Sequence, residues 1–388
     1  MAEEKANLLG MPRAALGSFF AKIGEKPYRA DQVMRWIYRG KVTDIDAMTN
    51  ISRSLRGHLK EIAEIRVPAF SAGTRSSDGV VKWLAHTEHG QAVETVLIPD
   101  AGAAYDGATE GGAPHRRNTL CISSQVGCAL DCSFCATGKQ GFNGNLTRAE
   151  IVGQVWQAGR ELADRGDERG ITNVVFMGMG EPLLNFQPVL DAADVLMDDL
   201  AFGISKRRVT ISTAGVVPRI RDLASHTDVS LAVSLHAPRD ELRNVLVPLN
   251  RKYPIAEVLD ACRHYLRGLG ERRSITMEYT LIDGVNDSVV DARDLAHLLT
   301  GLRTKVNLIP FNPFPEDRNG YRRPSPARID RFQTSLLNAG VATMLRTTRG
   351  DEIGAACGQL TGTVHDRTQR RTRYLARERV SLETRSVP

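Results

Sequence analysis

The sequence contains no apolar run of the roughly 18 residues that a helix needs to cross a bilayer. Its first residues, Met-Ala-Glu-Glu-Lys, lack the apolar segment of a secretory signal peptide. Cysteine is also scarce, with six in 388 residues. An oxidising compartment would tend to pair these cysteines, so a reducing compartment suits them better. We therefore expect a cytoplasmic protein with no membrane partner.

The sequence is long and carries an excess of positive charge. Its 388 residues exceed an average domain and 42% of them are hydrophobic, which predicts a large, barrel-sized domain with a smaller one beside it. The formal net charge is +6. Such an excess favours a polyanionic partner, although it also occurs in proteins that bind no nucleic acid.

Three of the six cysteines, Cys128, Cys132 and Cys135, lie in one short loop with a C-x3-C-x2-C spacing. Soft thiolates this close bind a common metal centre, and iron–sulfur clusters are held by such cysteines. A zinc site would need a fourth ligand at a similarly short spacing, and the next cysteine is Cys262. The pattern predicts a 4Fe-4S cluster with three protein ligands and one open iron. The alternative, three reduced core cysteines, is disfavoured by the polar and glycine neighbours.

This motif resembles the signature of the radical S-adenosylmethionine (radical SAM) enzymes, in which the open iron binds the amino and carboxylate groups of SAM. Phe134, just before the last cysteine, matches the usual aromatic position. The resemblance implies two cofactors, the iron–sulfur cluster and SAM. It also implies an α/β fold built on a partial parallel barrel.

Residues 1–65 are predicted to form a small helical domain. Apolar residues recur at helical spacing from 11 to 62, in segments that Gly24 and Pro27 help to separate. The predicted polar faces of these helices carry Arg29, Arg35, Arg39, Arg53, Arg56 and Lys60. Such faces are compatible with an RNA-binding accessory domain, and equally with ordinary solvated helices.

Residues 66–116 are predicted to form a β-linker followed by a mobile loop. Alternating segments at 80–84 and 93–98, separated by a turn around Gly90, predict two strands. By this alternation alone, Glu94 is a solvent-facing position. The stretch 100–114 is rich in glycine and alanine and has no periodicity, which predicts an exposed loop.

Residues 117–345 alternate between strand and helix patterns, which predicts a parallel sheet with crossover helices. Six strands suit the partial (βα)6 barrel of the radical SAM enzymes. The predicted strands are Thr119–Ser123, Ile171–Met177, Arg208–Thr213, Val229–Leu235, Ser274–Leu281 and Lys305–Ile309, and the clearest helices are Thr147–Leu162, Pro188–Leu196 and Ala292–Leu299. Because barrel enzymes build their sites at the carboxyl ends of strands, the residues there are the candidates.

Glycines and polar residues follow several of these strand ends. After the second strand, Gly180 lets a ligand approach the backbone, and Glu181 offers a carboxylate to a cationic amino group. Further candidates for binding the carboxylate, ribose and adenine of the cofactor are Ser212, Ser234, Leu235, His236 and Asn312. Serine and asparagine at such positions also commonly cap helices.

Residues 346–388 are predicted to form a catalytic cysteine loop and a basic tail. Cys357 lies in a stretch rich in glycine and charge, where nearby cations favour a reactive thiolate. Cys262 lies in an amphipathic helix, which predicts a core position. From 367 to 385 the tail carries seven arginines and two glutamates, a composition typical of segments that lie on phosphates or of disordered tails.

Several motifs together resemble the RlmN/Cfr family of radical SAM RNA methyltransferases. They span most of the chain, at 121–135, 141–146, 178–183, 307–315 and 349–360. The resemblance implies methylation at C2 of an adenine in the peptidyl-transferase centre of 23S rRNA, and at C2 of an anticodon-loop adenine in tRNA. Two alternatives remain open: C8 methylation, as by Cfr, and a non-catalytic iron–sulfur protein of RNA binding or ribosome assembly.

The resemblance also implies roles for three residues outside the cluster motif. Cys357 takes a methyl group from one SAM, and a 5′-deoxyadenosyl radical made from a second SAM abstracts hydrogen from that group. The methylene radical adds to C2, Glu94 removes the C2 proton, and Cys121 resolves the thioether by forming a disulfide with Cys357. Each turnover then needs two SAM and an external one-electron reductant such as flavodoxin or ferredoxin. We expect the enzyme to be a monomer.

Overall fold

The computed structural model describes residues 5–100, 117–167, 169–315 and 317–365. Within these ranges, no helix is both long enough and apolar enough to span a membrane. The mobile loop predicted at 100–114, apart from Asp100, and the basic tail at 367–385 lie outside the described residues.

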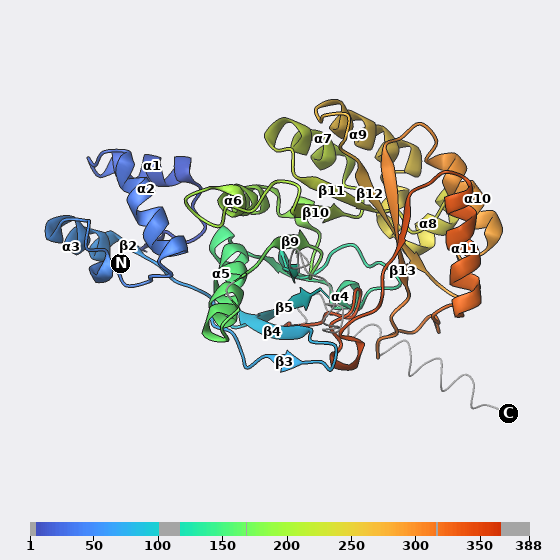
Figure 1. Ribbon diagram of the computed structural model, residues 1–388, viewed down its shortest axis with the longest axis horizontal. Helices are drawn as coiled ribbons and strands as arrows, with labels where there is room; N and C mark the ends of the chain where they lie inside the picture. Colours follow the sequence, from blue (N-terminus) through green and yellow to red (C-terminus); the bar gives the residue numbers. More distant parts are fainter. Residues whose placement is uncertain (1–4, 101–116, 168, 316, 366–388) are drawn as a thin grey trace, which may run out of the picture.

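A ten-stranded sheet in the order β14-β13-β12-β11-β10-β9-β6-β5-β4-β3 runs through the molecule (Figure 1). Its parallel part comprises β6 (Asn118–Cys121), β9 (Asn173–Phe176), β10 (Val209–Thr213), β11 (Ser230–Ser234), β12 (Ile275–Leu281), β13 (Thr304–Pro310) and β14 (Thr343–Leu345). The six predicted strands are therefore confirmed. The seventh, β14, escapes sequence patterning because it has only three residues, two of them exposed.

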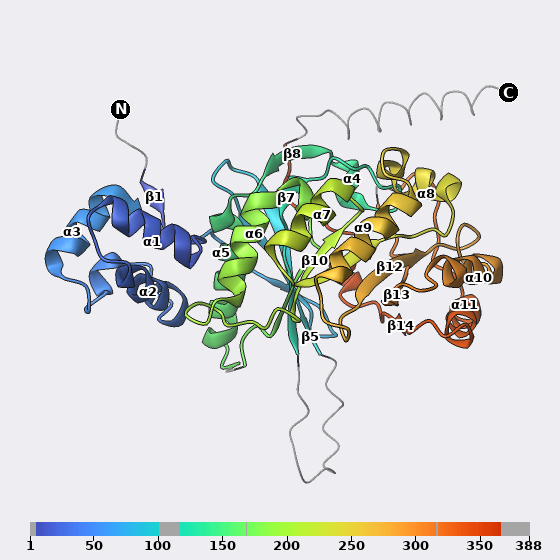
Figure 2. The ribbon, with the colours of Figure 1, turned by 90° about the horizontal axis from the view of Figure 1, so that it is seen from above.

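Helices connect the parallel strands and pack against the sheet (Figure 2). They are α5 (Arg148–Asp164), α6 (Phe186–Met197), α7 (Val217–His226), α8 (Asp240–Leu246), α9 (Ile255–Arg267), α10 (Val289–Leu298) and α11 (Pro326–Asn338). The three clearest predicted helices correspond to α5, α6 and α10. Helix α5 begins where its sequence predicts because Thr147 and Glu150 form a capping box.

The N-terminal helices form a separate group beside the sheet, in blue in Figure 1. They are α1 (Arg13–Lys22), α2 (Tyr28–Met34) and α3 (Arg53–Ile62), with a π-helical turn at Arg35–Arg39 and a short pairing of β1 (Ala6–Asn7) with β2 (Ala63–Glu64). Trp156 of α5 donates its indole N–H to the carbonyl of Ile37 at 2.8 Å. Arg39 donates to the carbonyl of Asp199 at 2.6 Å, so this arginine joins the helices to the barrel.

Three antiparallel strands extend the same sheet: β3 (Thr74–Arg75), β4 (Val81–His86) and β5 (Ala92–Pro99). The segment expected to be a linker is thus part of the central sheet. The expectation that Glu94 of β5 faces solvent is wrong, since its side chain is buried, with 5% of the residue exposed. Helix α5 covers one face of β5, where Gln154 bonds Thr95, and the chain at Thr361 covers the other.

The cluster loop, residues 128–135, follows β6 and β7 (Gln125–Gly127) and leads into α4 (Ala136–Lys139) and β8 (Phe142–Asn145). Gly127 has φ +72°, and a Cβ there would lie 1.8 Å from the carbonyl oxygen of Gly141. Only glycine fits this position, where the start of the cluster loop packs against the chain between α4 and β8. The cysteines are thereby held at the carboxyl end of the first parallel strand.

Candidate active site

Two adjoining cavities lie at the carboxyl ends of the parallel strands. The first, the cluster cavity, has a volume of about 160 Å³ and is lined by the three cluster-loop cysteines. The second, the cysteine cavity, has a volume of about 290 Å³ and is lined by Cys121 and the arginines Arg346 and Arg349. Both cavities share Met177, Ile309, Asn312 and Cys357 as lining residues. Cys357 therefore stands between them.

The donor set of the cluster cavity fits an iron–sulfur cluster. Burial raises the pKa of the Cys132 thiol well above its ordinary value, and nearby Cys128 and Cys135 raise it further. Three thiolates at this site thus require a cationic centre, which the irons of a cluster supply. Within the described ranges, no three His, Cys, Asp or Glu side chains converge closely enough for a single metal ion. Ligands at separate corners of a larger cluster need not converge on one point.

Glu181 presents a buried carboxylate to the cluster cavity. It is 3% exposed, and its two oxygens accept the backbone N–H groups of Leu183 at 3.0 Å and Ala214 at 2.7 Å. Burial raises the pKa of Glu181 to about 7, although these hydrogen bonds act in the opposite direction. In the described part of the chain, its contacts include no ion pair with lysine or arginine. An ammonium group in the cavity would supply that partner.

Gly180 lines the cluster cavity, but the reason for its glycine differs from the sequence-based expectation. It has φ +98°, and a Cβ there would lie 2.5 Å from the Cβ of Gln125. Close packing against β7, rather than space for a ligand, therefore excludes a side chain. The carboxamide of Gln125 accepts the N–H of Glu181 at 2.8 Å, which fixes the turn beside the cluster loop.

The lining of the cluster cavity also includes Ser212, Ser234 and His236 at the ends of β10 and β11. The Nδ1 atom of His236 accepts the N–H of Thr280 at 2.9 Å, so Nε2 carries the proton in the neutral ring. Burial lowers the pKa of His236 to about 3, and the ring is neutral at physiological pH. Leu235 is fully buried and does not line the cavity, because the strand alternation turns its side chain into the core.

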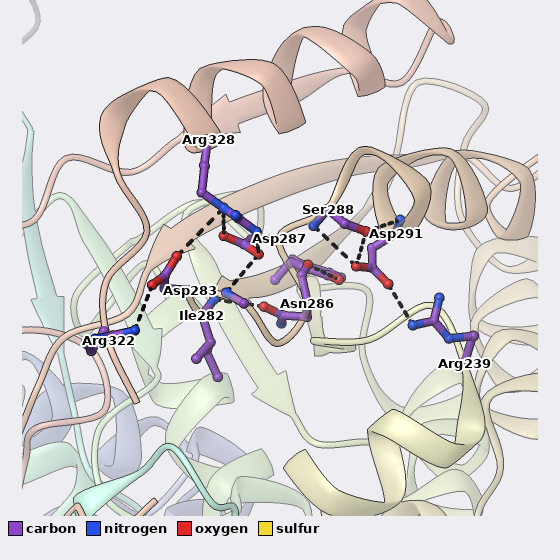
Figure 3. A network of polar contacts seen from close by, with 11 residues as sticks. Arg239, Ile282, Asp283, Asn286, Asp287, Ser288, Asp291, Arg322 and Arg328 are labelled. Carbon is purple, nitrogen blue, oxygen red and sulfur yellow. Dashed lines mark hydrogen bonds and ion pairs between the residues drawn. The ribbon is translucent and has the colours of Figure 1, made fainter. Parts of the chain in front are cut away.

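A hydrogen-bond network behind His236 supports its left-handed backbone, which has φ +58°. Figure 3 shows the part of this network around Asn286 and Asp287. The carboxamide of Asn286 donates to the carbonyls of His236 at 2.8 Å and Thr280 at 2.7 Å. Its neighbour Asp287 accepts Nε of Arg328 on α11 at 2.6 Å. The loop after β12 is therefore anchored to α11 on one side and to the cavity wall on the other. Nothing in the local sequence pattern indicates this support.

Cys121 and Cys357, distant in sequence, both line the cysteine cavity. Burial, and to a smaller extent Cys357, raise the pKa of Cys121 to about 12, while Arg346 acts in the opposite direction. The negative charge of Cys357 is in turn the largest effect raising the pKa of Arg346. Arg346 is thus electrostatically coupled to both cysteines. Arg346 directly follows β14. Had β14 been predicted from the sequence, Arg346 would have been a candidate site residue at a strand end.

Asn312 connects the two cavities through its carboxamide. Its Nδ2 donates to the carbonyl of Cys357 at 3.1 Å, and its Oδ1 accepts Arg323 at 2.8 Å and Thr348 at 3.2 Å. It therefore holds the loop that carries Cys357 against the end of β13. Cys262, by contrast, is fully buried in α9, as its amphipathic pattern predicts.

Glu94 lines neither cavity in this structure. Its Oε1 lies 2.9 Å from Nζ of Lys82, and its Oε2 accepts the N–H of Thr361 at 2.9 Å. The carboxylate therefore lies beneath the chain that follows Cys357. Lys82 was not identified from the sequence, because a lysine in an alternating strand normally marks a solvated face.

A parallel half-barrel whose first strand leads into a three-cysteine loop, with a buried carboxylate at the end of the second, defines a radical SAM enzyme. Residues 122–296 match the family model of the radical SAM superfamily. A radical SAM methyltransferase from Sphaerobacter thermophilus has a solved structure with a TM-score of 0.80 and 43% sequence identity to this protein. The match covers 92% of this chain and 99% of that one.

Residues 6–65 match a second family model, described as the N-terminal domain of ribosomal RNA large subunit methyltransferases. The dual-specificity RNA methyltransferase RlmN of Marinobacter nauticus is 58% identical over 381 residues, covering 98% of this chain and 99% of the relative. RlmN of Pseudomonas fluorescens is 54% identical, covering 96% and 94% of the two chains. The chain belongs to the RlmN family of radical SAM RNA methyltransferases, enzymes that use a 4Fe-4S cluster and SAM.

Proposed function

We propose that this enzyme methylates C2 of an adenine in the peptidyl-transferase centre of 23S rRNA and C2 of an anticodon-loop adenine in tRNA. One observation carries the proposal: Cys121 and Cys357 line one cavity, and Cys357 also lines the neighbouring cluster cavity. A cluster that served only structure or sensing would need neither cysteine. The RlmN name of the relatives supports C2 rather than C8.

C2 of adenine lies between two electronegative ring nitrogens and is not nucleophilic, so it does not attack a sulfonium methyl group directly. The route therefore begins on sulfur. The Cys357 thiol loses its proton to solvent, and the thiolate attacks the methyl carbon of a first SAM and displaces S-adenosylhomocysteine, leaving S-methylcysteine. The position of Cys357 between the cavities lets one side chain collect the methyl group and present it to RNA.

A cluster held by Cys128, Cys132 and Cys135 would supply the electron that cleaves a second SAM to methionine and a 5′-deoxyadenosyl radical, and would accept one electron after carbon–carbon bond formation. In the proposed sequence, the S-methyl group of Cys357 gives one hydrogen atom to the 5′-deoxyadenosyl radical, forming 5′-deoxyadenosine, and its methylene carbon bonds to C2. Glu94 accepts the C2 proton. The product at this stage is a thioether that joins Cys357 to the adenine.

Cys121 then releases the product. Its thiolate attacks the sulfur of Cys357, and the electrons of the carbon–sulfur bond leave with the methylene carbon, which takes up a proton and becomes the methyl group. The resulting Cys121–Cys357 disulfide needs two electrons, which we assign to a one-electron donor such as flavodoxin or ferredoxin acting twice. Arg346 lowers the pKa of Cys121 and so partly offsets the effect of burial on the thiolate that this step requires.

We assign the cluster to Cys128, Cys132 and Cys135, and the methionine amino group of SAM to Glu181 and the backbone at Gly180. Neutral His236, the hydroxyls of Ser212 and Ser234 and the carboxamide of Asn312 would bind the remaining polar groups of SAM. Leu235, which does not line the cavity, would serve only to hold the chain between Ser234 and His236. We place the enzyme in the cytoplasm as a monomer. Its N-terminal helices are proposed to contact RNA while the target base enters the cysteine cavity.

The test is an anaerobic reaction of the cluster-reconstituted enzyme with 23S rRNA fragments and with tRNA, followed by mass spectrometry of nucleosides. We expect 2-methyladenosine from both RNAs, with one S-adenosylhomocysteine and one 5′-deoxyadenosine per product. Finding 8-methyladenosine would overturn the C2 assignment. Cys357→Ala should abolish product, whereas Cys262→Ala, a cysteine outside both cavities, should retain it; full activity in Cys357→Ala would refute the proposed route.

A further inference from the structure

Lys82 forms two contacts that link the proposed base to the loop that carries the methyl group. Its Nζ lies 2.9 Å from Oε1 of Glu94 and donates to the carbonyl of Gly354 at 3.2 Å. In the pairing of β4 with β5, Lys82 is opposite Val96 and Leu84 is opposite Glu94. Lys82 and Glu94 are therefore diagonal neighbours on the same face of the sheet.

The other oxygen of Glu94 bonds the same loop from its far end. The N–H of Thr361 donates to Oε2 at 2.9 Å, and Thr363 pairs with Ala92 of β5 through two backbone hydrogen bonds of 2.9 Å. Gly354 precedes Cys357 by three residues and Thr361 follows it by four. One carboxylate and one ammonium thus hold both ends of the segment that contains Cys357.

We propose that Lys82 is a positioning residue for proton removal, keeping the Glu94 carboxylate and the Cys357 segment in one fixed arrangement. The inference rests on the proposed function, in which Glu94 accepts the C2 proton. Lys82 itself is assigned no contact with SAM or the adenine and acts through its contacts with Glu94 and Gly354. Its effect should therefore appear after the methylene group has been transferred to C2, and not before.

Burial explains why this pair needs both partners. The Glu94 side chain is 6% exposed and that of Lys82 19%, so an unpaired carboxylate here would lose its solvation without compensation. Methyl transfer to Cys357 and hydrogen abstraction from it involve the cluster cavity, to which Lys82 contributes no atom. Loss of Lys82 should therefore leave these earlier steps close to wild type while it slows the step that uses Glu94.

The experiment compares Lys82→Met with Lys82→Arg and with Lys206→Met, a matched removal of a lysine from an exposed pair with Asp228. Three quantities are measured in single-turnover reactions with rRNA: methylated Cys357, 5′-deoxyadenosine and 2-methyladenosine. Covalent protein–RNA adduct is followed on denaturing gels. A general base contributes roughly 10²–10⁴-fold, so we expect loss of its positioning partner to slow 2-methyladenosine formation by roughly tenfold to a hundredfold.

In Lys82→Met we expect normal Cys357 methylation and 5′-deoxyadenosine, with adduct accumulating in place of product. Lys82→Arg, which keeps a cation able to bond a carboxylate, should recover most of the product, and Lys206→Met should match wild type. Wild-type product formation in Lys82→Met would overturn the inference and leave the proposed function intact. Equal losses of all three quantities would show a merely structural role. Failure of the wild-type enzyme to form 2-methyladenosine would instead refute the proposed function.

Discussion

Replacing Glu181 with glutamine tests whether this buried carboxylate is the partner of the SAM amino group. Burial raises the pKa of Glu181 from 4.5 to about 7. A shift of this size corresponds to about 3 kcal/mol of free energy that disfavours the ionised form in the cavity. Because the ammonium of SAM needs the ionised form, protons and SAM compete for Glu181.

The competition gives a defined pH dependence. Glu181 has a pKa of about 7 in the free enzyme, so its ionised fraction falls as the pH is lowered from 7.5 to 6. The apparent Kd for SAM should then rise roughly eightfold. Glu181→Gln should bind SAM weakly at both pH values. The measurement is anaerobic equilibrium dialysis with labelled SAM and reconstituted enzyme, with the exposed substitution Glu271→Gln as control.

The carboxyl group of Glu181 also affects the stability of the folded protein when no cofactor is bound. Because the folded-state pKa of Glu181 is raised, its contribution to stability is greatest below pH 4.5 and is lost as the pH rises through about 7. Between pH 5 and pH 8, the free energy of unfolding of the wild type should therefore fall by roughly 2 to 3 kcal/mol relative to Glu181→Gln. Urea unfolding at the two pH values provides the comparison. Identical pH slopes, together with normal SAM binding by the glutamine variant, would refute the role assigned to Glu181.

Two further predictions follow from the cavity walls. Cys121→Ala removes the resolving thiol but neither the methyl carrier nor the cluster ligands, so a covalent RNA adduct through Cys357 should accumulate on denaturing gels; free product at the wild-type rate would contradict its role. Asn286→Ala removes two donated bonds and one accepted bond behind His236, and should lower the free energy of unfolding by roughly 2 to 4 kcal/mol. It should also weaken SAM binding, and unchanged urea unfolding with unchanged SAM affinity would show that this network does not support the cavity.

The sequence alone was sufficient for the features that depend on local spacing. The C-x3-C-x2-C motif placed three thiols in one loop, and the alternation of patterns after residue 117 predicted six parallel strands that the structure confirms. The capping box at Thr147 and Glu150 and the amphipathic pattern around Cys262 were equally local. These features were predictable because a few neighbouring residues determine each of them.

Only the tertiary structure decided which distant segments meet. Alternation in β5 placed Glu94 on a solvated face, yet α5 and the chain at Thr361 cover both faces of that strand and bury the carboxylate. In the same way, the contact of Lys82 with Gly354 joins residues 272 positions apart. Burial by remote segments leaves no periodic signal in a short strand, because alternation records only a difference between its two faces. The cysteines were therefore readable from the sequence, whereas the ion pair beneath the Cys357 segment was not.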